Sequence, residues 1–129
     1  MVFYLTFHYS LSFTKYVLCI LLCTYILLQG GKCVRNYLLS SMGYVVISID
    51  SRGSSNRGKA FESHIYKRLG QVELIDQLEV LKQMATEFEY LDLTRVAING
   101  WSYGGYLALR GIMDFPHIFK VNVHYIVLI

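Results

Sequence analysis

The chain has 129 residues, of which 54% are hydrophobic and 16% are charged, a length that suits one domain and a composition too apolar for a disordered segment. Its net charge is only +3, and no cluster of Lys and Arg interleaves with exposed aromatic residues. The composition therefore excludes an intrinsically disordered chain and predicts no nucleic-acid partner.

Residues 1–31 form an apolar leader that contains a single charged side chain, Lys15. Its core, residues 16–28, is an almost unbroken run of thirteen apolar positions, short of the about 20 residues that a membrane-spanning helix needs. The leader is interpreted either as a membrane anchor or signal, or as a buried strand-loop-strand or sequence foreign to the following domain. Cys19 and Cys23 lie here, and the odd total of three cysteines, without CxxC spacing, indicates neither a disulfide framework nor a metal site.

The charged part of the chain alternates strand and helix signals, which predicts an α/β fold with a parallel sheet and flanking helices. Residues 44–49 (YVVISI) lack polar alternation, so we expect a strand covered on both faces. Residues 51–70 are rich in Gly, Ser and Arg and have no sustained period. They predict a long loop with one helical turn, and loops of this length are uncommon unless functional.

A helix is predicted over residues 71–89 because apolar positions there step by four, three, four and three. The apolar positions are Leu74, Leu78, Leu81, Ala85 and Phe88. The positions expected to face water are Glu73, Lys82, Gln83 and Glu87.

Charged residues near the predicted strand ends are interpreted as loop anchors. Asp50 and Arg52 are expected to form a salt bridge that fixes the loop, with contact to substrate as the alternative for Arg52. Asp76 and Gln77 lie beside the apolar side of the helix, and we expect them to form hydrogen bonds with the loop.

Residues 95–98 (RVAI) predict a second strand of the sheet. Asp92 and Arg95 bracket its start, and Asp92 is expected to cap a short turn. A further helix should begin near Tyr103 and end near Pro116, followed by a strand-like run to the end of the sequence.

The motif G-x-S-x-G spans residues 100–104, between the predicted strand and helix. This is the context of a nucleophile elbow, in which a strained turn lifts a serine hydroxyl clear of the sheet. Gly100 and Gly104 would let strand and helix approach, and the Tyr103 backbone N–H would face a developing oxyanion. Ser102 is therefore the candidate nucleophile, and a Gly-Ser turn that merely caps the helix is the alternative.

Four segments together resemble the catalytic α/β-hydrolase domain of the prolyl oligopeptidase family of serine peptidases. They are IDSRGS (49–54), GQVELIDQ (70–77), DLTRVAI (92–98) and GWSYGGY (100–106). The Trp-Ser-Tyr form is similar to the dipeptidyl peptidase IV branch, and the intervening loop most resembles its cytosolic members. The similarity begins at residue 32 or 42 and ends near residue 121.

The resemblance implies a cytoplasmic exopeptidase that releases N-terminal dipeptides and prefers proline or alanine at the second position. It also implies a reaction without a metal or an organic cofactor. Its substrate would be a peptide, cleaved by an acyl-enzyme route on Ser102. Tyr103 would supply a backbone oxyanion donor and line the S1 pocket, and Trp101 would pack beneath the elbow. The glycines that support the elbow would be Gly100, Gly104 and Gly105.

A triad in this fold runs Ser, then Asp or Glu, then His, and only 27 residues follow Ser102. Asp114 lies twelve positions on, about 18 Å away along a continuous helix, and His117 shares that distant end. His124 lies on a strand returning toward the elbow, with no acid left to orient it. We therefore expect the triad acid and base to be missing. His8 and His64 are interpreted as structural or solvated.

The second oxyanion donor of the family is a tyrosine in a Tyr-Gly-Gly-Pro segment, for which this chain has residues 28–31 followed by Lys32. We expect three regions: the leader 1–31, a partial α/β-hydrolase domain 32–121 truncated at both ends, and a divergent apolar tail 122–129. The predicted function is a serine dipeptidyl peptidase fragment, inactive alone. The alternative is a non-catalytic protein that retains the hydrolase scaffold. It would either bind a partner or be anchored in a membrane through residues 1–31.

Overall fold

The computed structural model describes the backbone of residues 3–6, 16–21, 34–55 and 57–125, and the side chains of residues 38–55, 57–100 and 102–120. The strands are β1 (Phe3–Thr6), β2 (Tyr16–Leu21), β3 (Tyr44–Ile49), β4 (Val96–Trp101) and β5 (Phe119–Tyr125). The helices are α1 (Val34–Ser41), α2 (Lys59–Glu62), the 3₁₀ turn η1 (Ser63–Ile65), α3 (Val72–Glu87) and α4 (Tyr103–Asp114).

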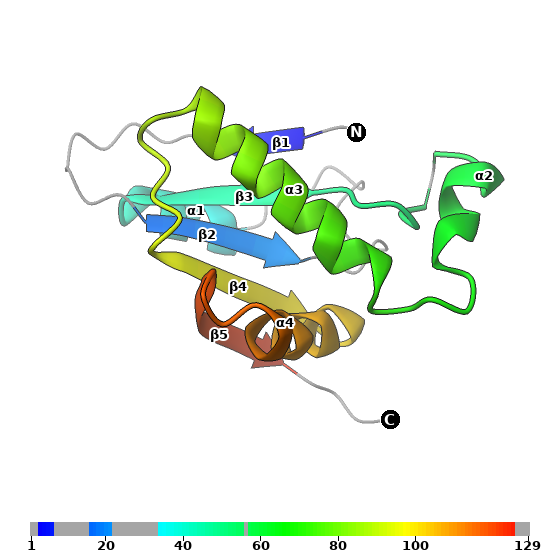
Figure 1. The fold of residues 1–129 in the computed structure, drawn as a ribbon. Coiled ribbons are helices and arrows are strands. Elements are labelled where there is room, and N and C mark those ends of the chain that lie inside the picture. Colours follow the sequence, from blue (N-terminus) through cyan, green and yellow to red (C-terminus); the bar gives the residue numbers. More distant parts are fainter. Residues whose placement is uncertain (1–2, 7–15, 22–33, 56, 126–129) are drawn as a thin grey trace.

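The five strands form one sheet in the order β1-β3-β2-β4-β5 (Figure 1). β3, β2, β4 and β5 run parallel, and β1 pairs antiparallel with β3 at the edge. Parallel pairing requires a crossover between consecutive strands, which α1, α3 and α4 supply in turn. The predicted α/β class with a parallel sheet is confirmed.

Two strands, β1 and β2, lie within the segment that the sequence sets apart as an apolar leader. β2 pairs with both β3 and β4, so it occupies the centre of the sheet. The alternatives for residues 16–28 include a membrane anchor or signal and a buried strand-loop-strand. The backbone of residues 16–21 forms a strand. The domain boundary at residue 31 and the tail boundary at residue 122 stay predictions. No helix in the described ranges has the length and apolar character to cross a bilayer.

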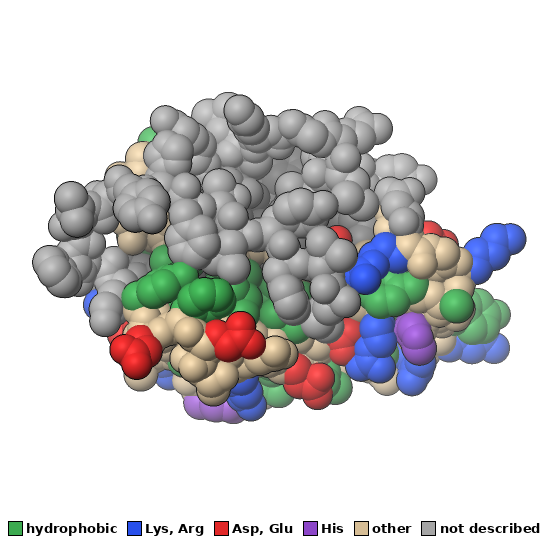
Figure 2. Space-filling model, turned by 90° about the horizontal axis from the view of Figure 1, so that it is seen from above, with side chains coloured by type: hydrophobic (Ala, Val, Ile, Leu, Met, Phe, Trp, Pro, Cys, Tyr) green, Lys and Arg blue, Asp and Glu red, His purple; other side chains and the backbone are tan. Residues whose placement is uncertain are grey.

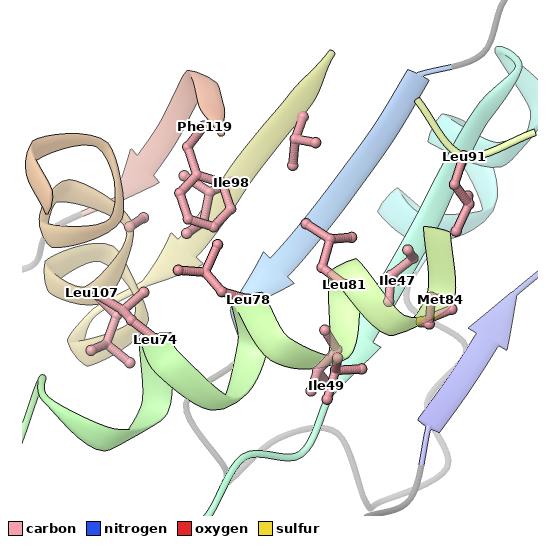
Figure 3. Close-up of a cluster of buried hydrophobic side chains, with 13 residues drawn as sticks. Ile47, Ile49, Leu74, Leu78, Leu81, Met84, Leu91, Ile98, Leu107 and Phe119 are labelled. Carbon is pink, nitrogen blue, oxygen red and sulfur yellow. The ribbon is translucent and has the colours of Figure 1, made fainter. Parts of the chain in front are cut away.

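The main core lies on the face of the sheet that α3 and α4 cover (Figure 3). Leu74, Leu78 and Leu81 are all buried, as the spacing of the apolar positions predicts. In Figure 3 Leu74 lies beside Leu107 of α4, while Leu78 points toward Ile98 of β4 and Leu81 lies on the side of Ile47 of β3. Both isoleucines have no exposed surface, which confirms the prediction of apolar strands buried by helices.

The opposite face of the sheet packs against α1, which lies behind the sheet in Figure 1. Val46 of β3 is buried there with Leu39 of α1 and Ala97 of β4 against it. β3 therefore has apolar neighbours on both faces, which explains its continuous apolar sequence. α1 is absent from the elements predicted from the sequence, because its eight residues are too few to display a helical period.

The chain between β3 and α3 is a long loop, as predicted, and it contains two consecutive turns, α2 and η1, where one was expected. The Gly53 N–H donates to the Phe61 carbonyl over 3.0 Å and joins the two halves of the loop. Figure 2 shows Lys, Arg and His side chains gathered at the end of the molecule where this loop lies. Lys59, Lys67 and Arg68 are exposed there.

The turn before β4 is fixed by Asp92, as the sequence predicts. Its carboxylate accepts hydrogen bonds from the Thr94 hydroxyl at 2.6 Å and the Thr94 N–H at 2.9 Å, and from Arg95 Nε at 2.7 Å. The bonds from Thr94, followed by that from Arg95, lower the pKa of Asp92 to about 2. The Asx-type turn therefore sets where β4 begins.

Candidate active site

The turn at Ser102 joins the carboxyl end of β4 directly to the first residue of α4. Ser102 has φ of 53° and ψ of −119°, a conformation that costs a non-glycine residue about 1–3 kcal/mol. Its side chain is exposed and forms no capping hydrogen bond with α4, although its carbonyl accepts the Tyr106 N–H over 3.1 Å. The hydroxyl therefore does not serve as a helix cap, and the turn has the strained geometry of an elbow.

Two glycines permit the close approach of strand and helix at this turn. A Cβ atom on Gly100 would lie 2.0 Å from the Gly104 carbonyl oxygen and 2.8 Å from the Gly105 nitrogen. Gly104 and Gly105 are themselves buried in the first turn of α4. Only a residue without a side chain fits at position 100, which explains the first glycine of the motif. The side chain of Trp101 lies outside the described residues.

Tyr103 ties the elbow to the beginning of α3. Its hydroxyl donates to Glu73 Oε1 over 2.5 Å, and the Gly70 N–H donates to the Tyr103 oxygen over 3.0 Å. The Tyr103 ring stacks on Tyr106 with centroids 5.7 Å apart. Burial raises the pKa of the Tyr103 phenol, and the hydrogen bond to Glu73 raises it further, so the phenol remains protonated near neutral pH.

The prediction that Glu73 faces water is wrong, because its side chain is only 5% exposed. The helix has a second buried row beside the apolar row on which the prediction rests. This second row steps by four, three and four through Glu73, Gln77, Val80 and Met84, all of which are buried. The apolar residues Val80 and Met84 in this second row indicate that the buried surface of α3 is wider than one row. Polar residues of the same row are therefore expected to pack against the protein.

Arg52 anchors the loop after β3 by binding Asp76 of α3, and not Asp50 as predicted. Its Nε lies 3.0 Å from Asp76 Oδ1 and 2.9 Å from Oδ2, and its backbone N–H donates to Oδ2 over 2.8 Å. The expected bond to the loop is confirmed for Asp76, whereas Gln77 Nε2 donates to the carbonyl of Ile49, the last residue of β3, over 3.3 Å. Burial favours the neutral acid, but the bonds from Arg52 outweigh it and lower the pKa of Asp76.

Asp114 and His117 lie at the far end of α4 and not at Ser102. Asp114 is the last residue of α4 and pairs with Arg110, which lies 2.7 Å away at Nη2. His117 follows that end of the helix and packs edge-on against Phe115. His124 lies on β5 with its Cα in register with Gly100, and its side chain lies outside the described residues.

His64 of η1 contacts the Phe61 ring of α2 edge-on. His8 and residues 28–31, the counterpart of the second oxyanion donor, lie outside the described residues. Among the residues that are described, no three His, Cys, Asp or Glu side chains are grouped as metal ligands.

The family assignment follows from comparison with known proteins. A profile of the prolyl oligopeptidase family matches residues 32–126. The chain is 46% identical over 95 residues to dipeptidyl peptidase 8 of mouse and of human, covering 74% of this chain and 11% of each relative. A crystal structure of a Bacteroides ovatus protein assigned as a dipeptidyl aminopeptidase IV superposes with a TM-score of 0.75 at 32% identity. That match covers 85% of this chain and 16% of the other.

These matches agree with the sheet, the helices and the elbow turn described above. The chain spans about a tenth of the length of the curated relatives that it matches. Its sheet and helices form part of an α/β-hydrolase fold. The chain belongs to the prolyl oligopeptidase family of serine-type peptidases.

Proposed function

We propose that this chain is a segment of the catalytic domain of a serine dipeptidyl peptidase, with Ser102 as the nucleophile. One observation carries the proposal: an exposed serine in a strained conformation stands between the carboxyl end of a parallel strand and the start of a helix. Catalytic side chains of open α/β sheets lie at this edge. The dipeptidyl peptidase names of the relatives supply the substrate class, a peptide with a free N-terminus.

The proposed reaction is acyl transfer through a tetrahedral intermediate. The Ser102 Oγ would attack the scissile carbonyl carbon and transfer its proton to a general base, while the carbonyl oxygen takes the negative charge. The backbone N–H of Tyr103 begins α4, where the helix dipole and the N–H direction both favour a nearby anion. Protonation of the leaving amine breaks the peptide bond, and water then hydrolyses the serine ester.

We further propose that the 129-residue chain by itself does not hydrolyse peptides. The reaction needs a histidine within hydrogen-bond reach of Ser102 Oγ, oriented by a carboxylate. Asp114, the one acid after the elbow in this sequence, is engaged by Arg110 at the distal end of α4. The preference for proline or alanine and the cytoplasmic location remain proposals that rest on the resemblance to the cytosolic dipeptidyl peptidases.

A chimera tests the proposed function. Residues 32–126 of this chain replace the segment of mouse dipeptidyl peptidase 8 that they match, and release of p-nitroaniline from a Xaa-Pro p-nitroanilide is measured. We expect the chimera to cleave the substrate and the Ser102→Ala chimera to lose activity by roughly 10⁴-fold or more. A folded chimera whose cleavage rate does not depend on Ser102 would contradict the proposal. The 129-residue chain alone is expected to release no p-nitroaniline above the buffer rate.

A further inference from the structure

Glu73 is a buried acid that the family resemblance and the elbow motif leave without a role. It is 5% exposed, lies in the first turn of α3 and binds Tyr103, the residue that follows the candidate nucleophile. Its Oε2 atom is buried and has no hydrogen-bond partner among the described residues. Burying a carboxylate with one oxygen unpaired is costly, so its retention calls for a compensating contact or function.

The direction of the hydrogen bonds at Tyr103 is fixed by its partners. The Gly70 N–H can only donate, so the Tyr103 oxygen accepts from it. The phenol hydrogen is then available for Glu73 Oε1, which accepts it over 2.5 Å. A short bond to a carboxylate is stronger and more directional than one between neutral groups. Glu73 and Gly70 therefore hold the Tyr103 hydroxyl from two sides.

Holding this hydroxyl constrains the backbone at the elbow. The peptide between Ser102 and Tyr103 carries the N–H that would face the oxyanion, and its Ser102 side is in a strained conformation. Strained backbone persists only where the surrounding contacts determine it. Tyr103 meets α3 through its hydroxyl and Tyr106 through its ring, so its side chain is fixed at both its tip and its face.

We infer that Glu73 is a positioning residue for the oxyanion donor: by fixing Tyr103, it holds the Ser102–Tyr103 peptide in the orientation that acyl transfer requires. The inference rests on the proposed function of Ser102. Glu73 does not touch the reacting atoms, so its removal should weaken transition-state stabilisation without removing the nucleophile. Its effect should be smaller than the loss of an oxyanion donor, which costs about 10²–10³-fold in rate.

The test uses the full chain carrying Ser102→Cys, because a thiol ionises without a neighbouring base. Acetylation of residue 102 by p-nitrophenyl acetate passes through an oxyanion and releases p-nitrophenoxide. Alkylation by iodoacetamide displaces iodide and forms no oxyanion. Peptide mass spectrometry reports both rates at residue 102 and separates them from the three native cysteines. The ratio of the rates cancels changes in thiolate fraction and exposure, which act on both reactions.

In this background, Glu73→Leu and Tyr103→Phe are each expected to lower the acetylation-to-alkylation ratio about tenfold, and the two together no further, because they break the same link. Glu73→Gln keeps an acceptor oxygen for the phenol and should restore most of the ratio. Glu79→Leu is the matched control, because Glu79 is exposed on the same helix, and it should leave the ratio unchanged.

Two results would overturn the inference in different ways. A ratio in folded Ser102→Cys protein that equals the ratio in denaturing urea would overturn the proposed function and the inference with it. A ratio that is raised on folding but unaffected by both Glu73→Leu and Tyr103→Phe would overturn the inference alone. Because Tyr103→Phe removes a single oxygen atom, it decides the question even where the Glu73→Leu protein does not fold.

Discussion

Gly100→Ala is expected to lower the free energy of unfolding by about 3 kcal/mol or more, the upper part of the range for overpacking. The new methyl group would lie 2.0 Å from the Gly104 carbonyl oxygen and 2.1 Å from its carbon. Both are backbone atoms in the first turn of α4, so they can move only if the helix separates from β4. Urea unfolding followed by far-ultraviolet circular dichroism measures the change.

Gly111→Ala is the matched control for this prediction. Position 111 lies in the same helix, but the nearest atom to its added methyl is the Ile98 Cδ1 at 2.8 Å, the flexible end of a side chain. The gain of about 1 kcal/mol from replacing a helical glycine offsets part of the repacking cost. We expect its free energy of unfolding to stay within about 1 kcal/mol of the unmodified protein. Equal losses in the two variants would contradict the role assigned to Gly100.

Arg52→Ala is expected to cost about 3 kcal/mol, because it leaves a buried carboxylate without its partner. The Asp76 side chain is 2% exposed, whereas that of Arg52 is 43% exposed, so most of the loss comes from the acid. The double variant Arg52→Leu and Asp76→Leu removes the charge together with its partner and should recover most of the stability. Urea unfolding at neutral pH compares the three proteins.

The contribution of Asp76 to stability should depend on pH in opposite directions in the unmodified protein and in the Arg52→Ala variant. In the unmodified protein the folded-state pKa of Asp76 is below its usual 3.8, so the stability it provides is present above pH 3.8 and declines as the pH falls toward the folded-state value. Without Arg52, burial is expected to raise that pKa above 3.8, so this group should favour folding more as the pH falls. An Arg52→Ala protein that loses stability on acidification as the unmodified protein does would contradict the assignment.

Local patterns were sufficient to predict most of the described elements. Residues 44–49 form β3 with the predicted bounds, and the periodic apolar run becomes α3. The G-x-S-x-G motif lies at the predicted strand-to-helix turn, since short-range sterics at Gly100 dictate that geometry. These features depend on neighbours within a few residues, which a single sequence displays.

The features that could not be predicted depend on contacts between distant segments. Arg52 lies beside Asp50 in sequence, but the loop carries it to Asp76, 24 positions away, and the buried acid provides the better partner. Glu73 of α3 meets Tyr103 thirty positions on, at the start of α4, with β4 between the two helices in the chain. The central place of β2 depends likewise on pairing with β3 and β4, which apolar composition alone does not specify.

Fluorophosphonate labelling of the 129-residue chain, located by peptide mass spectrometry across a pH series, tests the assignment of Ser102 most directly. The strained, exposed hydroxyl should react at Ser102 in preference to the other serines, slowly, with a rate that follows hydroxide concentration and shows no inflection near neutral pH. Modification spread evenly over the serines would contradict the elbow assignment. Rapid labelling of Ser102 with an inflection near pH 7 would show a working base and contradict the proposed inactivity of this chain alone.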